Sequence, residues 1–413
     1  MQYDLTAMQH CRPGFWLRNG CRCRSLQVWL RLLSGRSFFS SERLFPFHCP
    51  VRGGRNDCPG DDQVWLVMTA APLVSILMVA RNAALFIDAA IVSAREQSLT
   101  DIEIVVVDDG SSDCTAQHVR AHVATDSRVR LLEGPRRGLS AVRNTSLKAA
   151  RGHFAAILDS DDILHPRHLE WLMAGRVRGG AEILATNMVE FQEEGSRLTT
   201  RIFAEGPLWN DARPIEAEEY VERGMIGGKG ALPGYLKPLF DLSFLRANGV
   251  GYDERLRIGE DFDLVLRAML AGARYLYLPE PTYYYRRHVA STSHRLSRAD
   301  LEGLLRAAQA YPCETDGTLA AKVQARRENL EGALLHLDTI AAIKDGKLIR
   351  ALRLTAGHPD ARRLTLSSLY EATAKRIGLF RPVRQAVPPA HGEPLAERLR
   401  SITQGLQSAV LNP

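Results

Sequence analysis

Between Pro72 and Pro166 the chain alternates short apolar runs with segments of helical spacing, and this alternation limits the possible folds more than any other feature. The apolar runs have the length and residue types of buried strands and lie at 73–79, 102–107, 129–132 and 153–158. The segments between them have the spacing of amphipathic helices and lie at 83–97, from about 115, and at 138–150. Strands that alternate with helices predict an α/β fold with a mostly parallel sheet and helices on both faces.

Polar residues directly follow three of these predicted strands. They are Arg81–Asn82, Asp108–Asp109 and Asp159–Asp162. Open α/β sheets bind ligands beyond the carboxyl ends of their parallel strands, so we expect these side chains to share a site. Residues 159–162 read Asp-Ser-Asp-Asp, and carboxylates so close together repel one another unless a cation or donors neutralise them. A hard divalent ion that bridges to substrate phosphates fits this cluster, and a solvated acidic turn is the alternative.

A second acidic pair, Glu260–Asp261, precedes a segment with a helical apolar face that includes Leu264 and Val265. The pair is therefore expected at the amino end of a helix, where backbone N–H groups and the helix dipole favour anions. Simple capping of the helix would explain these acids without any chemistry. A role in proton transfer is the functional interpretation.

The rest of the chain is predicted more coarsely. Strands are expected at 181–186 and 275–278, with charged loops at 190–222 that include a helix around 216–223. The glycine-rich stretch 224–234 is interpreted either as a loop that closes over a ligand or as a surface linker. In the extended segment after Pro279, Arg286 and His288 should share one face and Arg287 the other, while Tyr283–Tyr285 should pack in the core.

Helical spacing returns in a C-terminal appendage, 299–380, before a Pro-rich tail, 381–413, that is expected to be loose. Segments with this spacing lie at 301–311, 319–336, 343–354 and 361–380. The last is basic and partly amphipathic, so it is interpreted either as a helix that rests on anionic lipid or as a solvated helix. No apolar run approaches the roughly 20 residues needed to cross a bilayer.

Charge and cysteine separate residues 1–67 from the remainder. The chain has a net charge of +6, and residues 1–67 contribute nine Arg, no Lys and five acids to it. The nearly balanced remainder gives no case for nucleic-acid binding. Five of the seven cysteines also lie in 1–67, in a spacing that fits no common zinc site, and the two others predict a reducing compartment. We expect 1–67 to be an unstructured or spurious extension, with Met68 as the true start.

Residues 72–162 resemble the nucleotide-binding half of a family 2 glycosyltransferase of the GT-A fold, and the resemblance extends to about residue 295. It is carried by a strand that ends in Arg81–Asn82, by Val107–Asp113, by Gly138–Asn144 and by Leu158–Asp162. The chain also resembles enzymes of bacterial exopolysaccharide assembly, such as succinoglycan-type transferases. The resemblance implies a nucleotide-binding half at 72–165 and an acceptor half at 166–295.

The same resemblance implies roles for individual residues. Asp109 would bind the nucleotide base, and Asp159 and Asp161 would hold a Mg or Mn ion against the donor diphosphate. Asp261 would be the general base that removes the proton of an acceptor hydroxyl. Further donor contacts are implied for Asn82, Arg143, Asp159, Ser160, Glu260, Arg287 and His288.

Several of these positions have structural alternatives. Asp108 is interpreted as a cap of its own turn, and Arg143 and Asn144 could be ordinary helix-surface residues. Arg287 and His288 are equal candidates for phosphate contact. Ala80 departs from the family, in which an aromatic residue often precedes the Asn, so stacking on the base is in doubt.

The implied activity is metal-dependent and inverting. One sugar would move from a nucleotide-sugar donor, with UDP the expected nucleotide, to a hydroxyl of a glycan or polyprenyl-linked saccharide. The QxxRW segment of processive synthases has no match, which favours single-sugar addition. The implied location is cytoplasmic, with peripheral association at the cytoplasmic face of the inner membrane as a further expectation.

Two other functions are weighed against this one. A nucleotidyltransferase would carry a Gly-rich phosphate-binding turn after its first strand, where this chain has Val79–Ala83. A non-catalytic module that only binds sugar nucleotides could lose its base, but both acidic motifs are intact.

Overall fold

The structure is a computed structural model, and it describes residues 71–376 except 195–196, 229, 289–295 and 312–316. The predictions for residues 1–67, including the Met68 start, and for the tail 381–413 lie outside the described residues.

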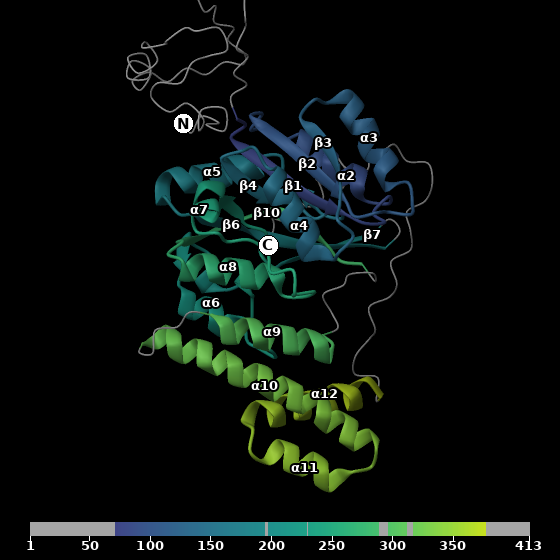
Figure 1. Cartoon of the computed structure of the whole chain (residues 1–413), viewed down its shortest axis with the longest axis vertical. Helices are drawn as coiled ribbons and strands as arrows, with labels where there is room; N and C mark the ends of the chain where they lie inside the picture. The colour runs from purple at the N-terminus through teal and green to yellow at the C-terminus, as the bar shows by residue number, and fades with distance from the viewer. Residues whose placement is uncertain (1–70, 195–196, 229, 289–295, 312–316, 377–413) are drawn as a thin grey trace, which may run out of the picture. The chain divides into compact units, whose positions relative to one another are not determined.

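One sheet organises the described chain (Figure 1), in the order β3-β2-β1-β4-β9-β6-β10-β5. Six of its strands run parallel, namely β1 (Val74–Ala80), β2 (Ile102–Asp108), β3 (Val129–Glu133), β4 (Phe154–Ile157), β6 (Ile183–Glu194) and β10 (Tyr275–Arg286). Short antiparallel strands complete it: β5 (Ile163–Leu164), β7 (Arg197–Ile202), β8 (Arg213–Ile215) and β9 (Leu239–Asp241). This is the mostly parallel α/β sheet that the alternation predicts.

Helices cover both faces of this sheet. The chain moves outward from β1 to β3 through α2 (Ile87–Arg95) and α3 (Thr115–Thr125), then returns to β4 through α4 (Leu139–Ala149). Because such crossovers are right-handed, reversing direction puts α4 on the opposite face from α2 and α3. The first turn of α8 (Glu260–Leu270) lies beside α4, since Arg143 of α4 pairs with Asp261, and Ser140 Oγ of α4 donates to the carbonyl of Leu256, just before α8, at 2.6 Å. One face of the sheet therefore carries α4 and α8 together.

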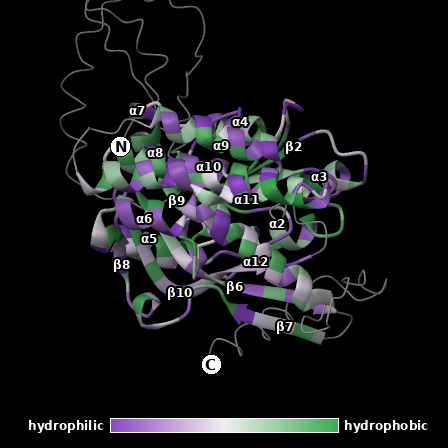
Figure 2. Ribbon diagram, turned by 90° about the horizontal axis from the view of Figure 1, so that it is seen from below, coloured by the Kyte–Doolittle hydropathy of each residue, from purple (hydrophilic) through white to green (hydrophobic). Residues whose placement is uncertain are grey.

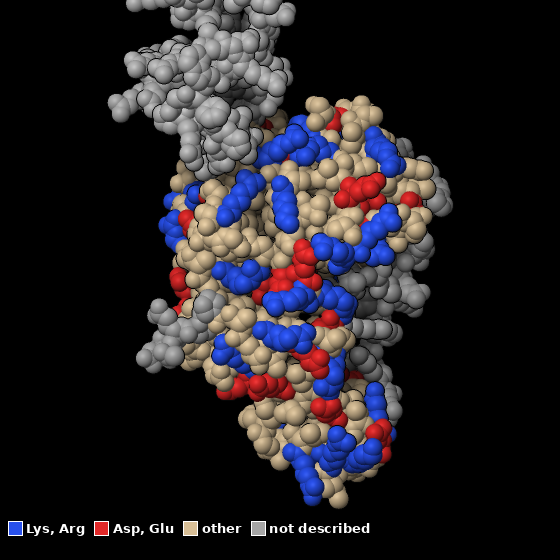
Figure 3. All heavy atoms as spheres, in the orientation of Figure 1, with Lys and Arg blue, Asp and Glu red and all other residues tan. Residues whose placement is uncertain are grey.

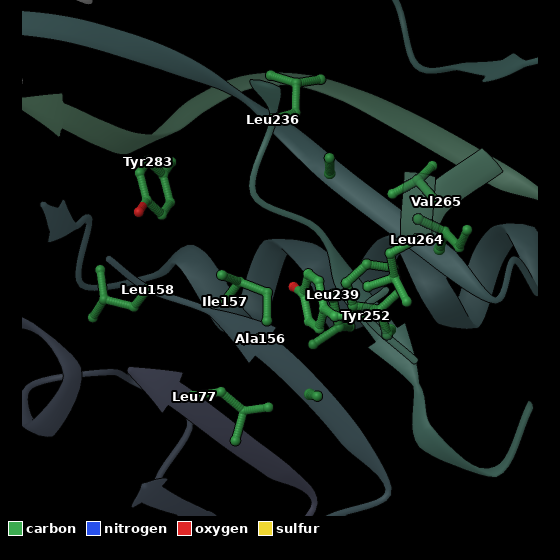
Figure 4. Close-up of a cluster of buried hydrophobic side chains, with 14 of the residues drawn as sticks. Leu77, Ala156, Ile157, Leu158, Leu236, Leu239, Tyr252, Leu264, Val265 and Tyr283 are labelled. Carbon is green, nitrogen blue, oxygen red and sulfur yellow. The ribbon is translucent and has the colours of Figure 1, made fainter. Parts of the chain in front are cut away.

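Part of the core lies between the sheet and α8. Figure 4 shows Leu264 and Val265 of α8 near Tyr252 and Leu239, with Ile157 of β4 in the same apolar cluster. All five are buried. This packing fixes the amino end of α8, and with it Asp261, over the sheet.

The prediction of charged loops across 190–222 is wrong for its first part. Strand β6 continues to Glu194 and pairs with β7 as a hairpin. Val189 and Phe191 are buried with Tyr284, while Glu190 between them is only partly covered, which is the period-2 pattern of a strand. Strand β10 likewise extends past residue 278 to Arg286, and its Tyr283 and Tyr284 are buried.

Further helices connect the sheet to the C-terminal region. They are α5 (His168–Gly179), η2 (Pro207–Trp209), α6 (Ala217–Arg223), η3 (Pro233–Tyr235), α7 (Leu242–Ala247), α9 (Arg298–Ala310), α10 (Thr318–Lys344), α11 (Leu348–Ala356) and α12 (Pro359–Arg376). Among the described residues, none of the helices combines the length and apolar character that crossing a bilayer requires.

The C-terminal helices are bonded to the glycine-rich stretch after α6. Arg326 of α10 donates to the Gly224 carbonyl at 2.6 Å, and Asn329 Oδ1 accepts from the Ile226 N–H at 2.7 Å. Arg363 of α12 donates to the Gly227 carbonyl at 2.8 Å. Residues 224–227 are therefore held in place by α10 and α12.

Candidate active site

The turns after β1 and β2 hold each other. Asn82, with a positive φ of 52°, accepts at Oδ1 from the Ser112 N–H at 2.8 Å. Asp108 accepts from the Ser111 N–H at 3.2 Å, which is the turn cap considered from the sequence. Asp109 is buried, and its Oδ1 accepts from the Arg136 N–H at 2.7 Å.

The acidic turn after β4 separates its carboxylates into different environments. Asp162 is fully buried and accepts from the Tyr283 hydroxyl at 2.7 Å and the Arg286 N–H at 2.8 Å. Burial and the neighbouring carboxylates raise its pKa well above the usual range. Asp161 Oδ2 instead lies 2.7 Å from His288 Nε2. Asp162 is thus a buried residue that holds the turn in place. Asp161 and His288 are only half-buried, so a ligand can reach them.

Two cations bridge the two acidic motifs. Arg143 of α4 pairs with Asp261 and lies 3.3 Å from Asp159 Oδ1 and 3.0 Å from Glu260 Oε1. Lys237, just before β9, places its Nζ 2.7 Å from Asp159 Oδ2 and 3.5 Å from Asp261 Oδ2. Asp159 and Asp261 therefore face each other across a shared pair of cations.

The cations decide the charge of these acids. Burial acts to raise the pKa of Asp261, but Arg143 and Lys237 outweigh it and lower this pKa to about 2. Burial likewise opposes ionisation of Asp159, and Lys237 and Arg143 still hold its pKa below the ordinary value. Glu260 differs, because burial and the negative charge of Asp261 raise its pKa to about 7. Asp261 is therefore ionised at neutral pH, whereas Glu260 gains or loses its proton close to neutral pH.

Aromatic packing fixes the first turn of α8, where Asp261 lies. Gly259, at φ 80°, begins the helix, and Phe262 stacks on Tyr220 of α6 with ring centroids 4.8 Å apart. The guanidinium of Arg326 lies 3.9 Å from the centroid of the Phe262 ring. The C-terminal helix α10 thus supports the residue next to Asp261.

Not every predicted site residue joins this group. Arg143, Asp159, Glu260 and Asp261 meet, and His288 meets Asp161. Arg287 points elsewhere, 3.7 Å from Glu190. Ser160 is half-buried in the acidic turn. Asn144 holds the Tyr252 backbone through bonds of 2.8 and 2.9 Å, which is a structural contact.

Lys237 was missed by sequence reasoning. Its side chain is only 10% exposed, although Lys is rarely buried unless it is paired. The sequence did carry a signal that this Lys is buried. It lies between Leu236 and Pro238, just before Leu239 and Phe240 of β9.

The acids of the site differ in how well they could hold a divalent ion. Both oxygens of Asp159 face cations, which opposes a metal ligand role. Asp161 and His288 place a carboxylate oxygen and an imidazole nitrogen 2.7 Å apart. The carboxylate suits either Mn or Mg, whereas the imidazole is a ligand of transition metals and favours Mn over Mg. Among the described residues, no cluster of three or more acids, His or Cys is arranged to hold a metal. The pair Asp161–His288 therefore fits the ion better than the predicted pair Asp159–Asp161.

Comparisons with known proteins agree with this architecture. Residues 75–229 match the family model described as glycosyl transferase family 2. The succinoglycan biosynthesis protein ExoO of Rhizobium meliloti (strain 1021) is 33% identical over 329 residues, covering 79% of this chain and 91% of the relative. ExoU of the same organism is 35% identical over 237 residues, covering 55% of this chain and 66% of the relative.

Solved structures show the same fold. S. aureus TarS 1–349 aligns with a TM-score of 0.52 at 18% identity, covering 73% of this chain and 92% of that one. Its complex with UDP-GlcNAc aligns with a TM-score of 0.50 at 20% identity, covering 64% and 81%. The likeness to these chains shows the GT-A fold.

Proposed function

Because this chain belongs to glycosyltransferase family 2, we propose that it moves one sugar from a nucleotide-sugar donor to a hydroxyl of a saccharide, with inversion at the anomeric carbon. The observation that carries the proposal is the facing of Asp159 and Asp261 across Arg143 and Lys237. A transfer reaction needs a group that neutralises the leaving diphosphate and a base for the acceptor in the same place.

The donor side is proposed at the carboxyl ends of β1, β2 and β4, in the half 72–165. Asp109 would bind the nucleotide base. Asn82, whose Oδ1 accepts from the Ser112 N–H, would contact the donor beside it, and Ser160 and Arg143 would contact the diphosphate. The nucleotide is proposed to be UDP, in keeping with the UDP-GlcNAc complex of S. aureus TarS. Arg287 is left out of the donor contacts, because it lies beside Glu190.

Asp261 is proposed as the general base. It would accept the proton of the acceptor hydroxyl as that oxygen attacks the anomeric carbon, so a single displacement inverts the configuration. A carboxylate with a pKa of about 2 is ionised but weakly basic. The proposal therefore requires Arg143 and Lys237 to share their charge with the donor diphosphate during the reaction, which would strengthen the base.

Asp161 and His288 are the residues that would hold a Mg or Mn ion. The chemistry that such an ion supplies is neutralisation of the charge on the nucleoside diphosphate leaving group. Arg143 and Lys237 would supply positive charge from the opposite side.

The acceptor is proposed to bind the half 166–295, and to be a glycan or polyprenyl-linked saccharide of exopolysaccharide assembly at the cytoplasmic face of the inner membrane. The name of the R. meliloti relative, a succinoglycan biosynthesis protein, supports the exopolysaccharide part of this proposal. A nucleotidyltransferase or a non-catalytic module is less favoured, because both acidic motifs meet at one site.

A donor screen tests the proposal. The full chain is incubated with a panel of UDP- and GDP-sugars and saccharide acceptors, and release of nucleoside diphosphate is measured with and without EDTA. We expect release with one donor that EDTA suppresses and excess Mn or Mg restores. Binding of a donor without any release, across the panel, would favour the non-catalytic module.

A further inference from the structure

Helix α11 exposes an apolar stripe, and this helix lies in the part of the described structure farthest from the sheet (Figure 1). Leu348, Ile349 and Leu352 are 62%, 70% and 69% exposed. Their spacing of i, i+1 and i+4 puts them on one side of the helix. The adjacent side packs inward through Ala351, which is buried, and Leu354, which is half-buried. A single helix thus divides into a packed face and an uncovered apolar face.

The neighbouring helix α12 adds to this surface. Leu366, Leu369 and Tyr370 are exposed on it, so α11 and α12 together carry six of the twelve exposed large apolar side chains of the described residues. Figure 2 shows hydrophobic and hydrophilic residues mixed along both helices. The presence of half of these exposed side chains on two neighbouring helices marks a surface that meets another apolar phase.

Positive charge surrounds the stripe. Residues 347–356 carry Lys347, Arg350 and Arg353 and no acid, and α12 adds the exposed Arg362. Lys347 pairs with Asp345 at 3.1 Å, so Arg350, Arg353 and Arg362 carry the main positive charge. Figure 3 shows Lys and Arg side chains around the end of the chain where α11 lies, with uncharged surface between them. Long basic side chains beside an apolar stripe can reach lipid headgroups while the stripe enters the acyl boundary.

We propose that α11, supported by α12, docks this enzyme on the surface of an anionic bilayer. The charge of α11 selects this occupant, because acidic lipid complements a helix that has only cations on its exposed side. One interpretation of the sequence predicts lipid contact at 361–380, whereas this proposal gives the main contact to α11. The inference does not depend on the identity of the donor or of the base.

The docked surface is joined to the active site. Helix α10 packs against α11 and α12, and its Arg326 and Asn329 hold Gly224 and Ile226. The same Arg326 supports Phe262, next to Asp261. Docking through α11 would therefore hold the base at a fixed position relative to the bilayer, as a lipid-linked acceptor requires.

Vesicle flotation of the full chain tests this proposal. We expect flotation with vesicles of phosphatidylcholine and phosphatidylglycerol, and at least tenfold weaker binding to phosphatidylcholine alone. The variant Leu348→Ser/Ile349→Ser/Leu352→Ser should lose at least about tenfold in binding, and Arg350→Gln/Arg353→Gln about fivefold per charge. The matched variant Val123→Ser/Val177→Ser, with exposed apolar residues elsewhere, should float like the parent chain.

Three results would overturn the proposal. One is absence of flotation with either vesicle. Another is equal binding of the α11 variant and the parent chain. The last is a dimer, seen by light scattering, that the α11 variant dissociates while vesicles bind neither protein, because a second copy would then cover the stripe. Nucleoside diphosphate release with a water-soluble acceptor should be unchanged in the α11 variant, which separates this test from that of the activity.

Discussion

His288 Nε2 lies 2.7 Å from Asp161 Oδ2, although 127 residues separate the two in sequence. The contact joins the segment after β10 to the acidic turn after β4. His288 also lies against Phe86, with ring centroids 5.2 Å apart, so its imidazole is held from both sides. This geometry distinguishes His288 from Arg287, two residues that the sequence could not separate.

We predict that His288→Ala raises the Mn or Mg concentration needed for half-maximal turnover by at least about tenfold, because one of two proposed ligands is lost. Arg287→Ala is the matched control, since this side chain lies beside Glu190 and should leave the metal requirement unchanged. Metal titrations of nucleoside diphosphate release measure both. An unaltered titration for His288→Ala would remove it from the ion site.

Lys237→Met should lower the free energy of unfolding by about 3 kcal/mol, because it removes one of the two cations that Asp159 and Asp261 share and leaves Arg143 as their only common counter-ion among the described residues. The control is Lys322→Met, whose pair with Glu222 is more exposed and should contribute less than about 1 kcal/mol. Urea unfolding followed by circular dichroism compares the two. Equal small losses would mean that Lys237 does not support the acid pair.

Gly224→Ala should disturb the base through packing alone. A Cβ at residue 224 would overlap the ring of Phe262, beside Asp261, whereas one at Gly357 would meet nothing within 4 Å. We expect Gly224→Ala to cost about 1–3 kcal/mol of stability and to lower kcat more than donor affinity. Gly357→Ala is the control and should change neither. A normal kcat in Gly224→Ala would show that the position of Phe262 does not matter to turnover.

The stability of the fold should fall in mild acid because of His168. This side chain is buried on α5 with Nδ1 2.8 Å from Thr282 Oγ1, and burial lowers its pKa to about 3. An unfolded His titrates near 6.5, so below that pH the unfolded chain binds a proton that the folded chain does not. The linked loss between pH 6.5 and 5 is about 2 kcal/mol.

His168→Gln should remove that part of the pH dependence, whatever its effect at pH 7. His153→Gln, at an exposed position, is the control and should keep the parent slope. Urea unfolding at pH 7 and pH 5 measures the difference. A variant at 168 with the full parent slope would assign the acid sensitivity to other groups.

Much of the fold could be predicted because its signals are local. The runs that form β1 and β2 are continuous and rich in Val and Ile, so they identify buried strands without any partner. The rule that ligands bind beyond parallel strands then placed Asp109 and Asp159 at one edge of the sheet. Strand β7 was missed, because it pairs only with the charged outer part of β6.

The contacts of the site could not be predicted because they are non-local. Lys237 reaches Asp159 only because β9 inserts between β4 and β6, a pairing that no sequence period announces. The exposed stripe of α11 likewise depends on which side of that helix packs against the rest of the C-terminal region. Composition alone favours 361–380 for lipid contact. Which apolar side chains of α11 stay exposed depends on how that helix packs, and composition does not reveal it.

The most direct test of the central claim is the turnover of Asp261→Asn beside its donor affinity. The substitution keeps the size of the side chain and its contact with Arg143 but removes the proton acceptor, so we predict a loss in kcat of at least about a hundredfold and donor binding within a few-fold of the parent chain. Unchanged kcat with normal donor binding would contradict the assignment of Asp261 as the base.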